Sequence, residues 1–440
     1  MASSLNLTDT LVHEFNGSQS NPFIILIHNL NAKKNPPVDA TQSTTLLLSV
    51  VTYNVIILVC LGIIFLPYLQ GKGTKNRRHW IVKRRYLDGH RQPYWIPNSG
   101  LIVAASHLLG STLFLVFLGL RYRAFQTGVP VESFYGTAWL ELRWFPGYCS
   151  FFSQAWSTWF VRASDATVKG KRSGIHPVAF NLNLIVLPTT ALVTALFLVS
   201  AQAAAMDAEA VSFKTMMESL ILVSHQWYPG QTSFNSPQFL LASTTFASYG
   251  VKSDQLLSRF RTTGLFWTLV AVPTLIFYMF GISTLLRVMY KRFRAVKREA
   301  ADSDICSTIS SSDSFRKRLK NTASHQQNMA NQLPTSFFYL GVHYTMMSLI
   351  LCYHIVIGLI FYLSDNTAMF QDKFLGLFMV LSNSGSYLLL AALLVQLLRI
   401  MLEGKEQARK VPSKIEKHFE YENHALEDSK KSHQDIKLMT

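Results

Sequence analysis

The sequence predicts an all-α fold: a polytopic membrane protein with a seven-transmembrane helix bundle, its N-terminus outside and its C-terminus cytoplasmic. Two observations carry this prediction. Hydrophobic residues make up 49% of the 440 residues, and they gather in runs long enough to cross a bilayer as helices. The formal net charge of +16 comes largely from Lys and Arg clusters beside these runs, and such clusters mark cytoplasmic loops.

The first apolar run sets the orientation of the chain. Residues 44–69 contain no Asp, Glu, Lys or Arg and are long enough to cross a hydrocarbon core of about 30 Å. The cationic stretch 72–91 follows at once. Short loops rich in Lys and Arg stay in the cytoplasm, so residues 1–43 are predicted to form an extracellular tail. This tail carries N-glycosylation sequons at Asn6 and Asn16.

Six further apolar runs complete a predicted transmembrane domain over residues 44–402. These spans are predicted at 101–120, 137–161, 178–203, 263–288, 335–363 and 374–401. The third of the seven spans is the least hydrophobic. Its ionisable residues Glu141 and Arg143 are expected to reach lipid headgroups at the outer end. Tryptophans near its ends and a cationic loop after it support the crossing.

Two connecting segments are long. Residues 204–262 read as an outer loop, in which the amphipathic stretch 213–223 predicts a short helix on the outer surface or folded over the bundle. Residues 289–334 read as a basic, Ser-rich inner loop without a packed core, and residues 403–440 as a charged cytoplasmic tail. Phosphate in the inner loop would weaken its attraction to anionic lipid. The candidate phosphorylation sites are Ser303, Ser307, Ser310, Ser311, Ser312 and Ser314.

Polar side chains inside apolar spans are the best pointers to function, because each must find a partner away from water. In the third span, Gln154 is the candidate polar anchor for a ligand, and the aromatic residues Tyr148 and Phe152 lie beside it. Together with His354 of the sixth span and Asn383 of the seventh, they predict a mainly apolar ligand pocket open to the outside. The alternative is that these residues hydrogen-bond between helices and fill the core.

The sequence predicts no enzyme. A membrane hydrolase needs histidines and a carboxylate that converge within the bilayer, and no Asp or Glu lies in the middle of any predicted span. His343 and His354 of the sixth span are roughly 16 Å apart along the helix, too far to share a metal ion. No cofactor, metal or nucleic-acid partner is predicted, and the lipid bilayer is the expected surrounding.

In its topology the whole chain resembles a G-protein-coupled receptor. The resemblance rests on the outer tail with its sequons, seven spans, a basic inner loop with serines and a charged inner tail. Residues 383–387, NSGSY, resemble the Asn-Pro-x-x-Tyr motif with Ser in place of Pro, whereas the third span ends in TWFVR, residues 158–162, instead of an acid-Arg-aromatic triplet. The aromatic third span is similar to orphan seven-span proteins of basidiomycete fungi.

The resemblance implies a plasma-membrane receptor. Such a protein senses an extracellular ligand and signals to a cytoplasmic partner, for example a heterotrimeric G protein. A transporter or channel subunit is the alternative, and it would show buried charges, broken helices and repeat symmetry. A structural membrane protein without receptor activity is a third interpretation.

Overall fold

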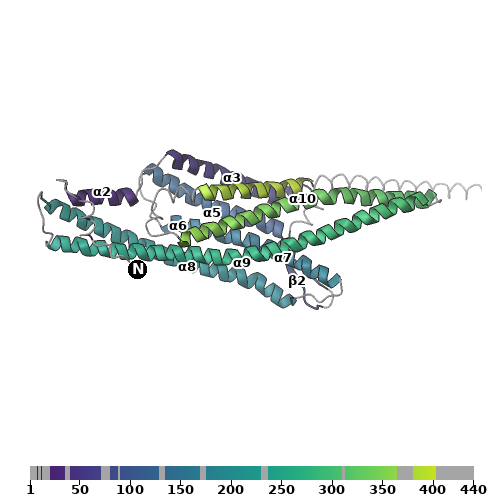
Figure 1. Cartoon of the computed structure of the whole chain (residues 1–440), viewed down its shortest axis with the longest axis horizontal. Helices are drawn as coiled ribbons and strands as arrows, with labels where there is room; N and C mark the ends of the chain where they lie inside the picture. The colour runs from purple at the N-terminus through teal and green to yellow at the C-terminus, as the bar shows by residue number, and fades with distance from the viewer. Residues whose placement is uncertain are drawn as a thin grey trace, which may run out of the picture.

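The structure is a computed structural model of the chain. It describes residues 7, 11, 20–34, 40–70, 80–87, 90–127, 134–168, 175–228, 236–309, 313–363 and 380–402. Long helices run side by side in an elongated bundle (Figure 1), which confirms the all-α prediction. The bundle consists of α3 (Ala40–Leu69), α5 (Ser99–Thr127), α6 (Phe134–Leu142), α7 (Trp144–Val168), α8 (Pro177–Gln226), α9 (Pro237–Ile309), α10 (Asp313–Leu363) and a C-terminal helix, Val380–Leu402.

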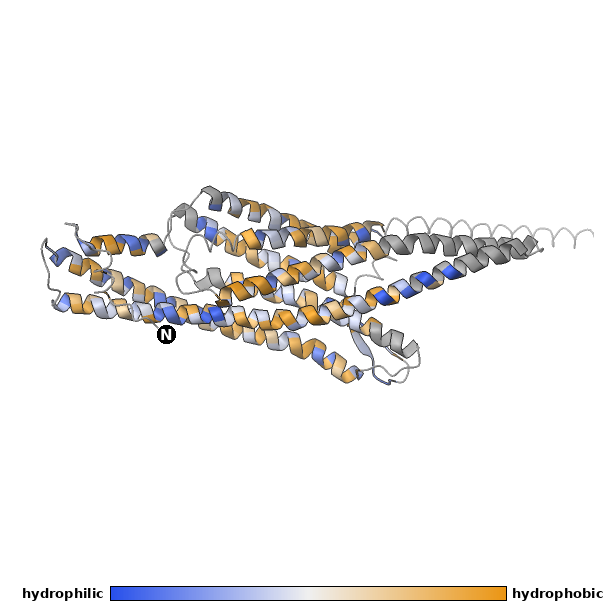
Figure 2. Cartoon of the chain, viewed as in Figure 1, coloured by the Kyte–Doolittle hydropathy of each residue, from blue (hydrophilic) through white to orange (hydrophobic). Residues whose placement is uncertain are grey.

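The protein is a polytopic, membrane-embedded helical protein. Six helices of the described part are long and apolar enough to cross a membrane: Gln42–Leu69, Ser99–Arg123, Pro177–Gln226, Pro237–Lys291, Phe337–Leu363 and Val380–Leu402. Their apolar residues lie along the middle of the bundle (Figure 2). Only 17–39% of the most apolar window of each is buried inside the protein, which leaves wide apolar faces for lipid. The seventh span and the orientation stay predictions.

The core of the bundle is one apolar cluster to which α3, α5, α7, α9, α10 and the C-terminal helix contribute. Close approach between α9 and α10 depends on two glycines. A Cβ atom on Gly264 would lie 2.9 Å from the carbonyl oxygen of Gly358 and 2.8 Å from Cβ of Phe361. Lipid tails are as apolar as side chains, so tight packing of this kind is what holds such helices together.

The helices α8 and α9 continue beyond the bundle as the α8–α9 hairpin, with α2 (Pro22–Lys34) beside it (Figure 1). A separate apolar cluster holds these elements together. It joins Leu7 and Phe23 of the N-terminal segment to Met216 and Leu220 of α8 and Phe246 of α9. A salt bridge of 3.3 Å from Lys34 to Glu209 lies beside it.

This hairpin differs from the outer loop expected over residues 204–262. In the structure, the described residues of that segment prolong α8 to Gln226 and begin α9 at Pro237. The stretch 213–223 is part of α8 and is not a separate helix folded over the bundle. Its apolar side chains pack against α9 and the N-terminal segment instead, so burial between distant parts of the chain maintains the helices.

At the opposite end of the bundle, α9 and α10 extend as the α9–α10 arm (Figure 1). The sequence predicted a loop without a packed core over 289–334, whereas the structure has α9 up to Ile309 and α10 from Asp313. Ser303 and Ser307 therefore lie on α9 and Ser314 on α10, while residues 310–312, with Ser310, Ser311 and Ser312, lie outside the described residues. Phosphorylation at these serines stays a prediction.

A small β-hairpin lies between α3 and α5 in the chain and packs on α7 and α8. Strand β1 (Val82–Arg85) pairs antiparallel with β2 (Tyr94–Pro97). Tyr94 is fully buried, and its hydroxyl donates to the carbonyl oxygen of Ile175 at 2.7 Å. The amide oxygen of Asn181 on α8 accepts from the backbone N–H of Trp95 at 2.8 Å. The cationic composition of this segment gave no hint of strands.

Candidate functional site

The candidate site is built around an interruption between α6 and α7. Helix α6 ends at Leu142, α7 begins at Trp144, and Arg143 forms the turn between them. Pro146 explains the break, because proline has no N–H and its ring clashes with the carbonyl group four residues earlier. Gly110 of α5 lies against the turn, where a Cβ atom would be 3.3 Å from the carbonyl oxygen of Arg143. The sequence predicted one uninterrupted span here.

The turn places the Arg143 guanidinium inside the bundle. Its Cζ atom lies 3.8 Å from the ring centroid of Phe114 and 5.0 Å from that of Trp144, distances at which a cation is attracted to an aromatic face. Its Nη2 donates to Ser382 Oγ at 3.3 Å, and Tyr53 of α3 also interacts with Arg143. Its Nη1 is buried and has no hydrogen-bond partner among the described residues.

Arg143 lines the first of two neighbouring cavities, which we call the arginine cavity. It holds about 630 Å³ of space free of protein atoms, counting its open mouth. Helices α3, α5, α7, α10 and the C-terminal helix surround it, and no Asp or Glu is among the described residues that line it. Its polar side chains are those of Tyr53, His107, Ser111, Arg143, Tyr353, His354, Ser382 and Ser386.

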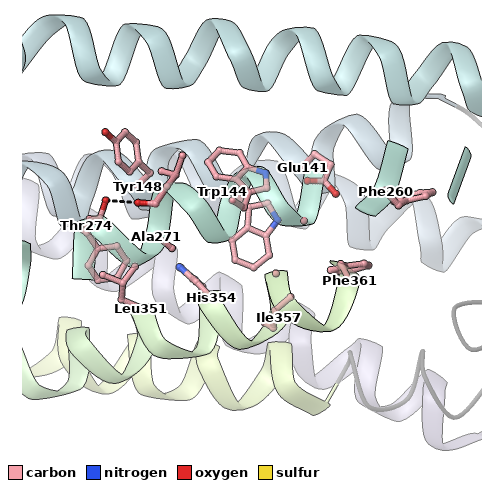
Figure 3. A pocket seen from close by; sticks show the side chains of 15 residues that line it. Glu141, Trp144, Tyr148, Phe260, Ala271, Thr274, Leu351, His354, Ile357 and Phe361 are labelled. Carbon is pink, nitrogen blue, oxygen red and sulfur yellow. Dashed lines mark hydrogen bonds between the residues drawn. The ribbon is translucent and has the colours of Figure 1, made fainter. Parts of the chain in front are cut away.

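The second cavity, which we call the tryptophan cavity, lies between α6, α7, α9 and α10 and holds about 570 Å³, again counting its mouth. Aromatic side chains dominate its wall, and Trp144, Tyr148 and His354 are arranged around it (Figure 3). The ring centroids of Trp144 and His354 are 4.7 Å apart. Trp144, His354 and Ile357 line both cavities, so the two spaces share a wall.

Glu141 lines the tryptophan cavity and is 8% exposed. Its carboxylate interacts with the Trp267 side chain of α9, and it forms no salt bridge with Arg143 among the interactions of the described residues. The sequence placed both ionisable groups at the outer end of a span, in reach of headgroups. In the structure Glu141 is buried and Arg143 lines a cavity between helices, which corrects that prediction.

The predicted ligand residues divide into two groups. Tyr148 and His354 line the cavities. Phe152 does not, because its ring stacks on Trp156 at 5.2 Å, within an aromatic cluster on α8 and the β-hairpin. Asn383 accepts a hydrogen bond from Ser49 of α3 and bridges two helices. Ligand binding itself stays a prediction for all of them.

Gln154, expected as the polar anchor of the pocket, lies deeper in the bundle. It is 2% exposed, and its Oε1 accepts from the Tyr278 hydroxyl at 3.0 Å. It lines a third, smaller cavity nearer the α9–α10 arm, together with His343 and Gln396. Gln154 thus lies apart from the arginine and tryptophan cavities, whereas Arg143, which the sequence did not single out as a ligand residue, lines the arginine cavity.

Two of the buried histidines have hydrogen-bond partners. His107 Nε2 and Ser150 Oγ are 3.0 Å apart, and His343 Nδ1 lies 3.0 Å from the carbonyl oxygen of Ala392. Across the part of the chain that the structure describes, no group of His, Cys, Asp and Glu has the geometry to hold a metal ion. The polar groups of the candidate site are therefore the Arg143 guanidinium, the Glu141 carboxyl group, the imidazoles of His107 and His354, and hydroxyls, set among aromatic rings.

The predicted glycosylation sites, Asn6 and Asn16, lie outside the described residues. Comparison with known proteins adds no assignment to this geometry. No protein-family model matches the chain, and neither a curated protein nor a solved structure is significantly similar to it.

Proposed function

We propose that this protein is a seven-transmembrane receptor-like protein, in which a ligand held in the arginine and tryptophan cavities alters the inner ends of the helices. The observation that carries the proposal is the position of the two cavities. Their walls come from α3, α5, α6, α7, α9, α10 and the C-terminal helix. A ligand there contacts nearly the whole bundle, so it can favour one arrangement of the helices over another.

The length of α9 supports a role in transmission. The helix runs without interruption from the tryptophan cavity, which Thr274 lines, to Ile309 in the α9–α10 arm. At roughly 1.5 Å per residue this distance is about 50 Å. A rotation or tilt of α9 at the cavity is therefore carried to the end of the arm by one rigid element.

A transporter is the second candidate, and one observation favours it. Interrupted helices and buried charges line the substrate sites of many transporters, and the α6–α7 break with Glu141 and Arg143 has both features. We favour the receptor, because the bundle has a packed apolar core, in which Ala104, Met347 and Leu393 are fully buried.

Nucleotide exchange on the G proteins of the host tests the receptor proposal. In membranes that contain the full chain, we expect the rate of GDP release from at least one heterotrimer to change by about twofold or more. Neutralising three exposed cations of α9, by Lys291→Gln, Arg294→Gln and Arg298→Gln, is expected to abolish the change, because under this proposal they provide the arm's contact with the G protein.

The matched control neutralises three exposed cations of β1 in the same way, Lys83→Gln, Arg84→Gln and Arg85→Gln. It removes equal charge from another element and should keep the change in exchange rate. Identical exchange rates with and without the protein, across all G proteins of the host, would contradict coupling to a G protein. Uptake of a labelled acid into proteoliposomes would instead favour the transporter.

A further inference from the structure

We propose that the ligand of this site is an apolar monocarboxylic acid, whose carboxylate binds Arg143 and whose apolar part fills the tryptophan cavity. This inference rests on the proposed function, because it names the chemical class of the ligand that the same site takes. It is carried by the hydrogen-bond partners of Arg143, by the charges around it and by the neighbouring apolar space.

The guanidinium of Arg143 is incompletely satisfied. Arginine offers five N–H donors, and a buried donor without an acceptor is costly. Nη2 reaches Ser382 at the long distance of 3.3 Å, whereas Nη1 has no partner among the described residues. The face of the guanidinium is covered by Phe114. The edge of the group is thus left to bind an acceptor in the arginine cavity.

The charge around Arg143 selects an anion. A buried cation needs a counter-charge, and no Asp or Glu is among the described residues that line the arginine cavity. Glu141 interacts electrostatically with Arg143 from the tryptophan cavity, but the two form no salt bridge among the described residues. Tyr53 and Ser382, which interact with Arg143, bring hydroxyl donors to the same place. A planar carboxylate matches the fork of a guanidinium and accepts two parallel hydrogen bonds from it. The site is therefore suited to a carboxylate.

The tryptophan cavity selects the rest of the ligand. It adjoins the arginine cavity through Trp144 and His354, and aromatic and aliphatic side chains dominate its wall. An apolar chain or ring fits such a surface, with the carboxylate as the polar anchor. Glu141 lines the tryptophan cavity, and no Lys or Arg is among its described lining residues, so a second carboxylate at the far end of the ligand would be buried without a cation to pair with it. This is why the ligand is a monoacid and not a diacid.

Binding of four probes to the purified full chain in lipid nanodiscs tests the proposal. The probes are decanoate, decanol, dodecanedioate and chloride. Calorimetric titration, corrected for partition into empty nanodiscs, should show saturable binding of decanoate and none of decanol. Dodecanedioate should bind at least tenfold more weakly than decanoate. Chloride alone should not reproduce the effect of decanoate.

Substitutions at the site separate its parts. Arg143→Gln is expected to weaken decanoate about tenfold or more, because charge-assisted hydrogen bonds are lost, and Arg143→Lys less so, because it keeps the charge without the fork. Glu141→Gln should reduce the preference for decanoate over dodecanedioate, because an amide replaces the acidic group that lies beside the second carboxylate. This last variant keeps Arg143 and tests the proposal even if Arg143→Gln does not fold. Arg399→Gln, in the third cavity, is the matched control and should bind decanoate normally.

Several results would overturn the proposal. They are equal binding of decanoate and decanol, decanoate affinity that Arg143→Gln does not alter, or saturation of the site by chloride with the same dependence on Arg143. Arg143-dependent binding of decanoate without any change in G-protein exchange would leave the ligand class standing and contradict the receptor. A change in nucleotide exchange without decanoate binding would support the receptor and contradict the proposed ligand class.

Discussion

Replacing Gly264 by leucine is expected to prevent α9 and α10 from closing against each other. A Cβ atom at this position would already lie 2.8 Å from Cβ of Phe361 and 2.9 Å from the carbonyl oxygen of Gly358, so the backbones of the two helices must move apart. Overpacking a well-packed core costs about 1–3 kcal/mol, occasionally more. Here the obstacle is backbone, which cannot rotate away, and we expect about 3 kcal/mol or more.

The measurement is the fraction of monodisperse protein after solubilisation, together with the apparent Tm in detergent. Gly341→Leu is the matched control on α10, because nothing lies within 4 Å of a Cβ atom there. We expect Gly264→Leu to be lost or strongly destabilised and Gly341→Leu to behave like the parent protein. Equal stability of the two variants would show that α9 and α10 do not approach at this point.

Replacing Phe151 by alanine should destabilise the protein by a similar amount. Here the cause is a cavity left in the core and not overpacking. The Phe151 ring is fully buried, with its centroid 5.9 Å from those of both Tyr278 and His354. Truncation of a buried phenylalanine costs about 3–5 kcal/mol. The apparent Tm should therefore fall by on the order of 10 °C.

Phe197→Ala on α8 supplies the control, because that ring is 68% exposed on the face left to lipid. The same atoms are removed without opening a cavity in the bundle, so the apparent Tm should stay near that of the parent protein. A comparable loss for both substitutions would mean that Phe151 does not lie in the packed interior of the bundle.

The membrane spans could be predicted from the sequence because hydropathy depends on local composition alone. A helix in lipid must satisfy its backbone within itself, so an apolar run of sufficient length is nearly enough to define it. The predicted spans 44–69 and 335–363 match Gln42–Leu69 and Phe337–Leu363 closely. The third predicted span, 137–161, contains ionisable residues. It is not among the six described helices that are long and apolar enough to cross a membrane.

The α8–α9 hairpin could not be predicted in this way. Asp207, Glu209 and Lys214 interrupt the apolar pattern at the end of α8, and charge of this kind usually marks a loop. The helices continue because Met216 of α8 and Phe246 of α9 are buried in one apolar cluster with Phe23. Phe23 is nearly 200 residues away from Met216 in the chain. Contacts between such distant residues are a tertiary property, which local patterns do not contain.

Arg143 was not predicted as a cavity residue, although Tyr148 and His354 were, and the reason is different. Charged residues near the end of a span usually extend to the headgroups, and this rule was applied to Arg143. The sequence does hold a contrary signal, because the stretch Trp144–Gly147 contains Pro146 and marks a helix start just after the arginine. A helix that restarts inside the bundle turns the preceding side chain inward, which is what the structure shows.

The central claim, that a ligand can reach a cavity beside Arg143 within the bundle, is tested most directly by cysteine accessibility. Ser382 lines the arginine cavity, so Ser382→Cys is introduced into a chain whose four cysteines are replaced by serine. A membrane-impermeant cationic thiosulfonate reacts only with thiols exposed to water. The controls are Leu393→Cys, at a fully buried position, and Leu394→Cys, at a position that is 45% exposed on the apolar surface.

We expect the reagent to modify Ser382→Cys when it is added on the side of the N-terminal tail, and to leave both leucine controls unmodified. Decanoate should slow the reaction by occupying the cavity. If Ser382→Cys is as inert as Leu393→Cys from both sides of the membrane, no water-accessible cavity exists beside Arg143, and the proposed site is contradicted.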